Sequence, residues 1–155
     1  MAEIRPMTAA DQETVLRMMR PFYASEAVMT NGSEEIFRRD LEACTGPSPY
    51  AEGFLLLEEG QIAGYAMIAR SFSTEFGRSC IWIEDLYLEP EHRGKGLGSG
   101  FLRFLRRREP EAVLRLEAER ENRRAIAVYE GCGFSELPYL EMIQHPTKEE
   151  KGTRP

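Results

Sequence analysis

Two adjacent carboxylates, Glu84 and Asp85, lie within the apolar run SCIWIEDLYLEP and are the first candidates for chemistry. The apolar residues of this run predict a β-strand, which Pro90 ends. A carboxylate beside a reacting group can accept a proton, so the pair suits general-base catalysis on a protonated substrate. Because successive strand residues point to opposite faces, we expect only one of the two to face the substrate, Glu84 in preference to Asp85. The alternative interpretation is a solvated or ion-paired acid near a strand end.

The alternation of apolar residues slips within this strand. Ile81 and Ile83 set one phase, whereas Leu86 and Leu88 set the other. A slip of one residue near Glu84 predicts a β-bulge at the carboxylate pair.

A glycine-rich segment, HRGKGLGSG, follows the strand and precedes a run with apolar residues at helical spacing. Backbone N–H groups of the segment and the positive end of that helix converge on one spot, which predicts an anion-binding site. Lys95 is followed by Gly96, so the Walker pattern fails, and Ser99 and Phe101 stand where a dinucleotide fingerprint needs glycine. The alternative, a flexible surface turn, has a cost in backbone entropy that nothing structural requires.

Two signatures carry a resemblance to a known family. The segment RGKGLG, Arg93 to Gly98, resembles the pyrophosphate-binding pattern of the GNAT acetyltransferase superfamily and lies between a strand and a helix, as in that family. The segment NRRAIAVYEGCGF, Asn122 to Phe134, is similar to the family's second signature. The resemblance covers residues 2–144, and WIEDLYLEPEHRGKGLGSGFL is similar to the spermidine/spermine and thialysine branch. It implies transfer of an acetyl group from acetyl-CoA to a primary amine by direct attack in a ternary complex, with a small cationic amine favoured.

The resemblance also implies roles for individual residues. The acetyl-CoA contacts, most of them backbone groups, would be Leu86, Tyr87, Leu88, Arg93, Gly94, Lys95, Gly96, Leu97, Gly98, Ser99, Asn122, Ala125 and Tyr129. Tyr129 matches the family's general acid, which protonates the departing CoA thiolate, and Glu84 would be the base that deprotonates the amine. The acceptor site would contain Phe22, Tyr23, Glu26, Trp82 and Asp85.

Several of these residues have a simpler structural explanation. Tyr129 lies on the apolar stripe of its helix, where a packing role is the alternative. Asn122 is also a good N-cap. The basic residues Lys95, Arg123 and Arg124 either add charge near the phosphates or form a solvated face.

The elements that must position these residues predict an α+β, three-layer α/β/α fold. Strands are expected near the N-terminus, twice within 53–72, at the carboxylate pair and around 112–119, with a last short strand over Tyr139–Ile143. Helices are expected after Thr8, after Ser33, over Leu97–Arg108 and after Asn122. With the resemblance, this gives a central mixed, mostly antiparallel sheet of six to seven strands flanked by about four helices.

The composition limits the other properties. The chain has 155 residues, 42% of them hydrophobic, and a formal net charge of −6. We expect one acetyltransferase domain, 1–144, and a polar, disordered tail, 145–155. The acidic charge disfavours nucleic acid and anionic membrane as partners. Cys44, Cys80 and Cys132 predict free thiols, and no metal site is expected. No apolar run approaches a membrane span and the start has no leader, so a cytoplasmic location is expected.

Two rival functions stay open at this point. One is acetylation of a protein N-terminus or lysine, which an open groove would favour. The other is a non-catalytic module that binds acyl-CoA, against which the presence of Glu84 and Tyr129 argues. Dimers are common in the resembling branch, so a homodimer is among the expected assemblies.

Overall fold

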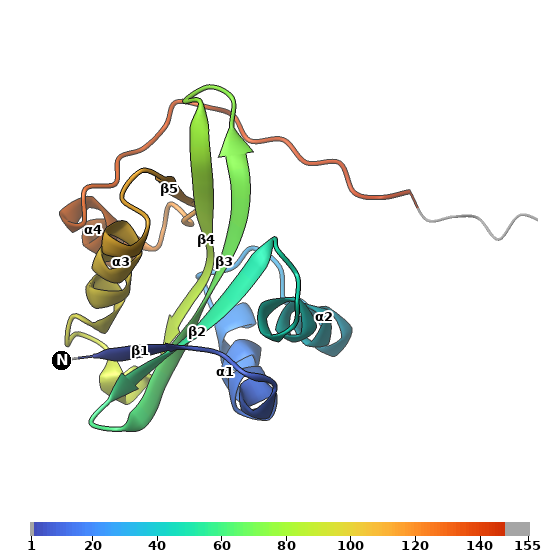
Figure 1. Ribbon diagram of the computed structural model, residues 1–155, viewed down its shortest axis with the longest axis vertical. Helices are drawn as coiled ribbons and strands as arrows, with labels where there is room; N and C mark the ends of the chain where they lie inside the picture. Colours follow the sequence, from blue (N-terminus) through green and yellow to red (C-terminus); the bar gives the residue numbers. More distant parts are fainter. Residues whose placement is uncertain (1, 148–155) are drawn as a thin grey trace, which may run out of the picture.

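The computed structural model describes residues 2–147, and within them a mixed five-stranded sheet lies between two layers of helices (Figure 1). The strands are β1 (Glu3–Pro6), β2 (Ala51–Glu58), β3 (Gln61–Ser73), β4 (Arg78–Leu88) and β5 (Val113–Leu116), and they neighbour one another in sequence order. β1 to β4 pair antiparallel, whereas β5 pairs parallel to β4. The predicted α+β, three-layer class is therefore confirmed.

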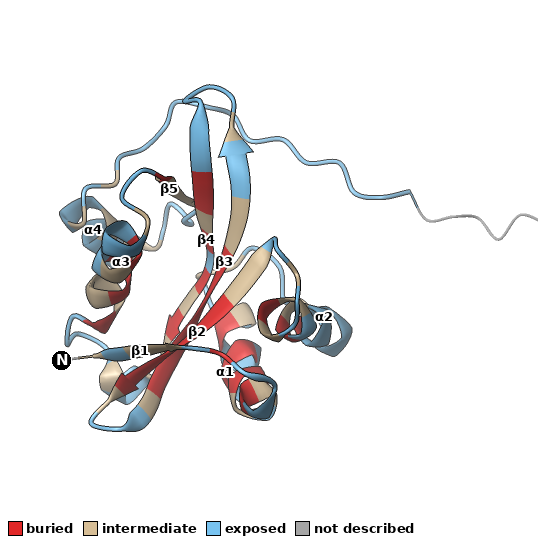
Figure 2. Ribbon diagram, in the orientation of Figure 1, coloured by how far each residue is buried: buried red, intermediate tan, exposed pale blue. Residues whose placement is uncertain are grey.

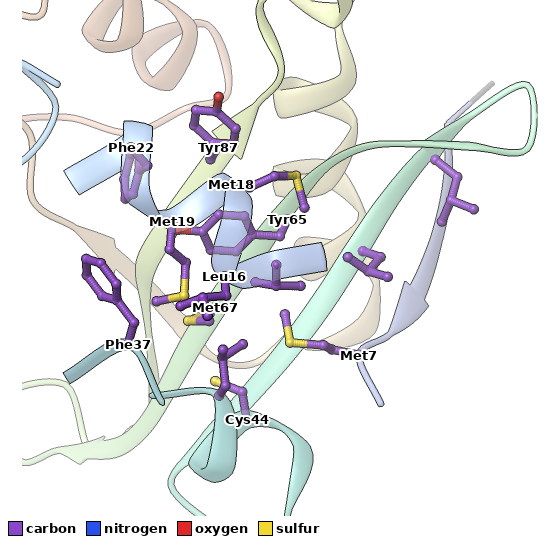
Figure 3. Close-up of a cluster of buried hydrophobic side chains, with 14 residues drawn as sticks. Met7, Leu16, Met18, Met19, Phe22, Phe37, Cys44, Tyr65, Met67 and Tyr87 are labelled. Carbon is purple, nitrogen blue, oxygen red and sulfur yellow. The ribbon is translucent and has the colours of Figure 1, made fainter. Parts of the chain in front are cut away.

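Helices α1 (Gln12–Tyr23) and α2 (Glu34–Thr45) cover one face of the sheet. The short 3-10 turn η1 (Ala9–Asp11) leads into α1, the helix expected after Thr8, which continues through Pro21 and buries its apolar residues against the sheet. Ser33 caps α2 by accepting a hydrogen bond from the backbone N–H of Ile36, 3.2 Å away. Figure 3 shows how the side chains of this layer, among them Phe22 and Met19, pack against Tyr65 and Tyr87 of the sheet.

Helices α3 (Leu97–Arg108) and α4 (Arg123–Gly131) cover the other face. A second 3-10 turn, η2 (Pro90–His92), lies between β4 and the glycine loop. α3 buries Leu97, Phe101, Leu102 and Leu105 against the sheet, but α4 buries none of its residues, as the colours of Figure 2 show. In this second layer, α3 is therefore well packed against the sheet, whereas α4 is only loosely packed.

The predicted strand count is wrong. The sheet has five strands in the part of the chain that the structure describes, not six to seven, and it ends at β5. The expected last strand, Tyr139–Ile143, has no regular structure, because within the described residues no strand pairs with its backbone. Of the tail predicted at 145–155, residues 148–155 lie outside the described residues.

Candidate active site

A β-bulge lies where the sequence predicted one, at Glu84. Ile83 pairs with Ile68 and Asp85 with Met67, so Glu84 has no partner residue on β3. On the other side, pairing between β4 and β5 ends at Ile83 and Leu116. The pairing of the two parallel strands therefore ends just before the carboxylate pair, and β4 from Glu84 onward is unpaired on the side of β5. We call this separation of the two strand backbones the cleft.

Glu84 lies near other acids. The residue is exposed, but partial desolvation of its carboxyl group raises its pKa, and the charges of Asp85 and Glu141 raise it further. A carboxylate with a raised pKa is a better proton acceptor than an ordinary one. Glu84 is therefore a candidate general base at the bulge, with a raised pKa.

Asp85 is in a different environment, because it is buried and hydrogen-bonded. Its side chain is 4% exposed, and it accepts hydrogen bonds from the hydroxyl groups of Tyr23, 2.9 Å away, and Tyr65, 2.8 Å away. Desolvation raises the pKa of Asp85, and the two tyrosine hydrogen bonds partly oppose that rise. Because both of its oxygens accept hydrogen bonds, the Asp85 side chain is held in one orientation.

The sequence argument missed Asp40 of α2. Burial and the charges of Asp85 and Glu84 raise the pKa of Asp40 to about 6. The charges of Glu84 and Asp85 therefore both reach Asp40, which belongs to the layer formed by α1 and α2. The expectation that they face opposite sides assumed regular alternation, which the bulge interrupts at this pair. Nothing in the local sequence of α2 distinguishes Asp40 from a surface acid.

The glycine loop has the geometry of an anion site. Gly94 and Gly96 adopt φ of 76° and 81°, the left-handed region that favours glycine. Gly96 is the N-cap of α3 and offers no side-chain cap, so the first N–H groups of the helix have no capping partner. A Cβ added at Gly96 would meet open space, and one added at Gly98 would lie 3.9 Å from Leu86. The open start of α3 therefore lies beside β4 near the cleft.

The basic side chains of the loop have partners of their own. Lys95 forms a salt bridge of 2.8 Å with Glu58, and Arg93 donates to the carbonyl oxygen of Leu88 at 2.9 Å. Arg124 of α4 does reach the loop, since a Cβ on Gly94 would lie 3.3 Å from its Nη2 atom. Backbone N–H groups, with Arg124 near them, are thus the groups available to a phosphate.

Tyr129 and Asn122 belong to α4. Tyr129 is partly buried against the core on this face of the sheet, with its ring 6.2 Å from that of Phe134. Desolvation raises the pKa of Tyr129, so burial favours its protonated hydroxyl form. Asn122 accepts a hydrogen bond of 3.4 Å from the backbone N–H of Ala125, which confirms its capping role.

The remaining acceptor-site candidates differ in position. Phe22 and Tyr23 lie at the end of α1, and the Tyr23 ring packs edge-on against Phe22 at 5.3 Å. Trp82 of β4 pairs with Arg115 of β5, one residue before the last pair between these strands. The guanidinium carbon of Arg115 lies over the Trp82 ring, 4.6 Å from its centre. That face of Trp82 is therefore occupied by a cation of the protein itself. Glu26 follows α1 and is exposed.

Neither a metal centre nor a membrane span emerges from residues 2–147. No group of three or more His, Cys, Asp or Glu side chains within this part of the chain is arranged to hold a metal ion. None of its helices is both long and apolar enough to cross a membrane.

The family model described as acetyltransferase (GNAT) family matches residues 16–134, which include the cleft and the glycine loop. The chain belongs to this family. It is 30% identical over 151 residues to the thialysine N-epsilon-acetyltransferase of Bos taurus, a match that covers 89% of this chain and 86% of that protein. As a member of the GNAT family with such a relative, it is an N-acetyltransferase.

Solved structures agree on the fold. A possible acetyltransferase from Clostridium difficile 630 superposes with a TM-score of 0.78 at 19% identity, over 96% of this chain and 99% of that one. A predicted acetyltransferase from Clostridium acetobutylicum, solved with acetyl-CoA, has a TM-score of 0.72 at 22% identity, over 92% and 96%. GNAT acetyltransferases use acetyl-CoA as the acetyl donor.

Proposed function

We propose that this acetyltransferase transfers the acetyl group of acetyl-CoA to a primary amine of a small cationic molecule, in a ternary complex without a covalent enzyme intermediate. The observation that carries the proposal is the group of acids at the bulge, where the charges of Glu84 and Asp85 both act on Asp40 of α2. Burial raises the pKa of Asp40 and of Glu84, and the charges of neighbouring acids raise both pKa values further. Because a bound cation would relieve this repulsion, a cationic amine is the acceptor that these acids favour.

In the proposed site, the backbone N–H groups of Gly96, Leu97 and Gly98 hold the pyrophosphate of acetyl-CoA at the start of α3. Leu86, Tyr87 and Leu88 pair with β3 but not with β5, so the backbone groups of this stretch that face away from β3 can bind the pantetheine arm. The thioester of acetyl-CoA supplies an activated acyl group. Ser99, Asn122 and Ala125 line the same side, as the family resemblance implies.

Each proton has a proposed carrier. Glu84 accepts the proton of the bound ammonium group, because an alkylamine has a pKa near 10 and arrives mostly protonated. The neutral nitrogen then bonds to the thioester carbon, whose oxygen a free backbone N–H near Leu86 polarises. When the carbon–sulfur bond breaks, the Tyr129 hydroxyl donates its proton to the departing thiolate, and the second proton that the nitrogen loses as the amide forms restores the Tyr129 hydroxyl. The proton held by Glu84 passes to solvent. Asp85, held in one orientation by its two tyrosines, lies beside Glu84 as a positioning residue.

The name of the bovine relative supports the acceptor class, since it specifies acetylation of the Nε atom of thialysine. We infer that the acceptor here is likewise an aliphatic amine on a small molecule, and that Tyr23, Phe22 and Trp82 line its site. Domain bounds of 1–144 would contain all of these residues.

The decisive experiment is an acetyl-transfer screen over polyamines, amino acids, aminoglycosides and peptides, with release of the CoA thiol as the readout. Turnover with a small amine supports the proposal. Turnover with peptides alone would assign the chain to protein acetylation instead. A melting shift with acetyl-CoA but no CoA release on any acceptor would indicate a binding module.

A further inference from the structure

A hollow toward the turn of the β3–β4 hairpin has no role in the site described so far. It has a volume of about 240 Å³ and is lined by side chains of β3, β4, β5 and the hairpin turn. Ser71, Ser73 and Thr74 contribute hydroxyl groups to it, and Trp82 and Arg115 complete its lining toward the bulge. The two long strands extend beyond the helices here, as Figure 1 shows, so the hollow opens to solvent. We call it the Arg115 hollow.

The Arg115 hollow and the candidate base lie on the same face of the sheet. Trp82 lines the hollow, whereas its neighbours Ile81 and Ile83 pack in the core on the α3 side. Because side chains alternate along a strand, Trp82 faces the side of α1 and α2. The charge of Glu84 acts on Asp40 of α2, which lies on that side as well. One small molecule can therefore contact both the hollow and Glu84.

Arg115 gives the hollow a positive charge. Its guanidinium carbon lies 4.6 Å from the centre of the Trp82 ring, so the cation is held over an aromatic face. Among residues 2–147, no carboxylate forms a salt bridge with Arg115. A guanidinium presents N–H donors in a planar fork that matches the two oxygens of a carboxylate. A carboxylate is therefore the group that this hollow fits.

Glu75 supplies the opposite charge at the rim of the hollow. Its carboxylate accepts a hydrogen bond of 2.7 Å from the hydroxyl of Tyr139. That hydrogen bond raises the pKa of Tyr139, and the charge of Arg115 opposes the rise, so the three groups lie within electrostatic reach of one another. A ligand held by Arg115 can therefore carry an ammonium group near Glu75. A ligand with amines alone would instead place a cation against Arg115.

We propose that the Arg115 hollow is the second half of the acceptor site and binds a carboxylate of the acceptor, so that the substrate is a free amino acid with a terminal side-chain amine and not a polyamine. The inference rests on the proposed function, because it takes Glu84 as the base. Strand residues two positions apart, such as Trp82 and Glu84, lie about 7 Å from each other. The extended chain of bonds from the ε-amine of lysine to its carboxylate also spans about 7 Å. The amine at Glu84 and the carboxylate at Arg115 are then the two ends of one molecule.

The test compares two matched acceptors, free lysine and cadaverine, which is lysine without its carboxylate. Wild type should acetylate lysine with a kcat/KM about 10- to 100-fold above that for cadaverine, as charge-assisted hydrogen bonds to one carboxylate give. Arg115→Gln should remove this preference. Arg115→Lys keeps the charge without the planar fork and should keep part of it. The control is Arg107→Gln, which removes the same charge from an exposed position at the end of α3 and should keep the full preference.

The ratio of the two acceptors within one variant is the quantity that decides, so it is informative even if Arg115→Gln melts earlier after losing the contact with Trp82. A wild type that acetylates cadaverine at least as well as lysine contradicts the inference. So does Arg115→Gln that retains the preference for lysine, or turnover of other small amines but of neither member of the pair. All three results leave the proposed function standing. No release of CoA with any small amine, by contrast, would overturn the proposed function itself.

Discussion

The two helical layers of this molecule are packed to different degrees. α1 buries Val15, Leu16, Met18, Met19 and Phe22 against the sheet, whereas α4 buries none of its residues. The α1 and α2 layer also encloses Asp85, whose oxygens are both hydrogen-bonded by tyrosines. By contrast, the α3 and α4 layer leaves the N–H groups at the start of α3 without a capping side chain.

This difference corresponds to what each side would bind. A small acceptor is recognised by fixed charges in a preformed site, so its layer must be complete in the free protein. A large donor such as acetyl-CoA buries much protein surface when it binds. The α3 and α4 layer can therefore stay incompletely packed in the free protein and be stabilised by the bound donor. The carboxylate Glu84 lies at the boundary, where the bulge separates β4 from β5.

The largest expected effect comes from replacing Glu84. Glu84→Gln keeps the shape of the side chain but removes the proton acceptor, so kcat/KM should fall by roughly 10²- to 10⁴-fold. Acetyl-CoA binding, measured by calorimetry, should be unchanged because the carboxylate is not part of the loop site. Activity should recover at high pH, where free amine is abundant.

Asp85→Asn is the control for this variant. It replaces a buried, doubly hydrogen-bonded carboxylate, so we expect a lower melting temperature and a smaller loss of kcat. If Asp85→Asn abolishes activity while Glu84→Gln is normal, the base is Asp85 and the assignment is wrong by one residue.

The difference in packing between α1 and α4 predicts the next effect. Leu16 is fully buried, so Leu16→Ala should lower the free energy of unfolding by about 3 kcal/mol. Val128 of α4 is 36% exposed, so Val128→Ala should cost less than about 0.5 kcal/mol. Urea unfolding measures both. Equal costs would mean that α4 is as firmly packed as α1 in solution.

The open layer should tighten when acetyl-CoA binds. At about a hundred times its Kd, a ligand that binds only the native state adds roughly 2.7 kcal/mol, visible as a melting shift without added metal. Gly96→Glu should abolish the shift by placing a charge where pyrophosphate would bind. Gly96→Ala is the control, since it introduces the same left-handed strain without the carboxylate and should keep part of the shift.

Tyr129 connects the open layer to catalysis. Tyr129→Phe keeps the ring and removes the proton, so kcat should fall roughly 10- to 100-fold while KM for acetyl-CoA changes little. If the variant instead melts earlier and turns over normally, Tyr129 is a packing residue only.

Local patterns in the sequence were sufficient for much of this architecture. The phase slip between Ile83 and Leu86 predicted the bulge, because strand alternation has a fixed period. Helical spacing predicted α1 and α3, and short-range capping chemistry predicted the roles of Ser33 and Asn122. The glycine loop was predictable because its backbone conformation depends on adjacent residues.

Contacts between distant elements were not predictable in this way. Tyr65 lies 20 residues from Asp85 in the sequence, and only the pairing of β3 with β4 brings its hydroxyl to that carboxylate. The Lys95 salt bridge with Glu58 spans 37 residues. The prediction of a strand at Tyr139–Ile143 was wrong for a related reason. Strand propensity depends on local residues, whereas pairing with a neighbouring strand depends on residues far away in the sequence.

The smallest expected effect concerns Asp40, the acid that only the structure revealed. Its pKa is about 6 in the folded protein and near 3.8 in an unfolded chain. The native state therefore holds this proton more tightly, so stability from Asp40 is greatest below pH 4 and is lost as the pH rises toward 6. Asp40→Asn cannot ionise, so above pH 6 it should be more stable than wild type, by roughly 1 kcal/mol after allowance for solvent screening.

The same variant should bind a cationic acceptor less well, because it removes one negative charge from the cleft. We expect KM for the amine to rise roughly threefold at pH 8, where Asp40 is ionised, and to match wild type more closely at pH 5. Glu42→Gln, on an exposed position of the same helix, is the control and should change neither quantity. A stability gain without any change in KM would show that Asp40 is a strained core acid outside the acceptor site, and the acidic cleft would then consist of the β4 pair without α2.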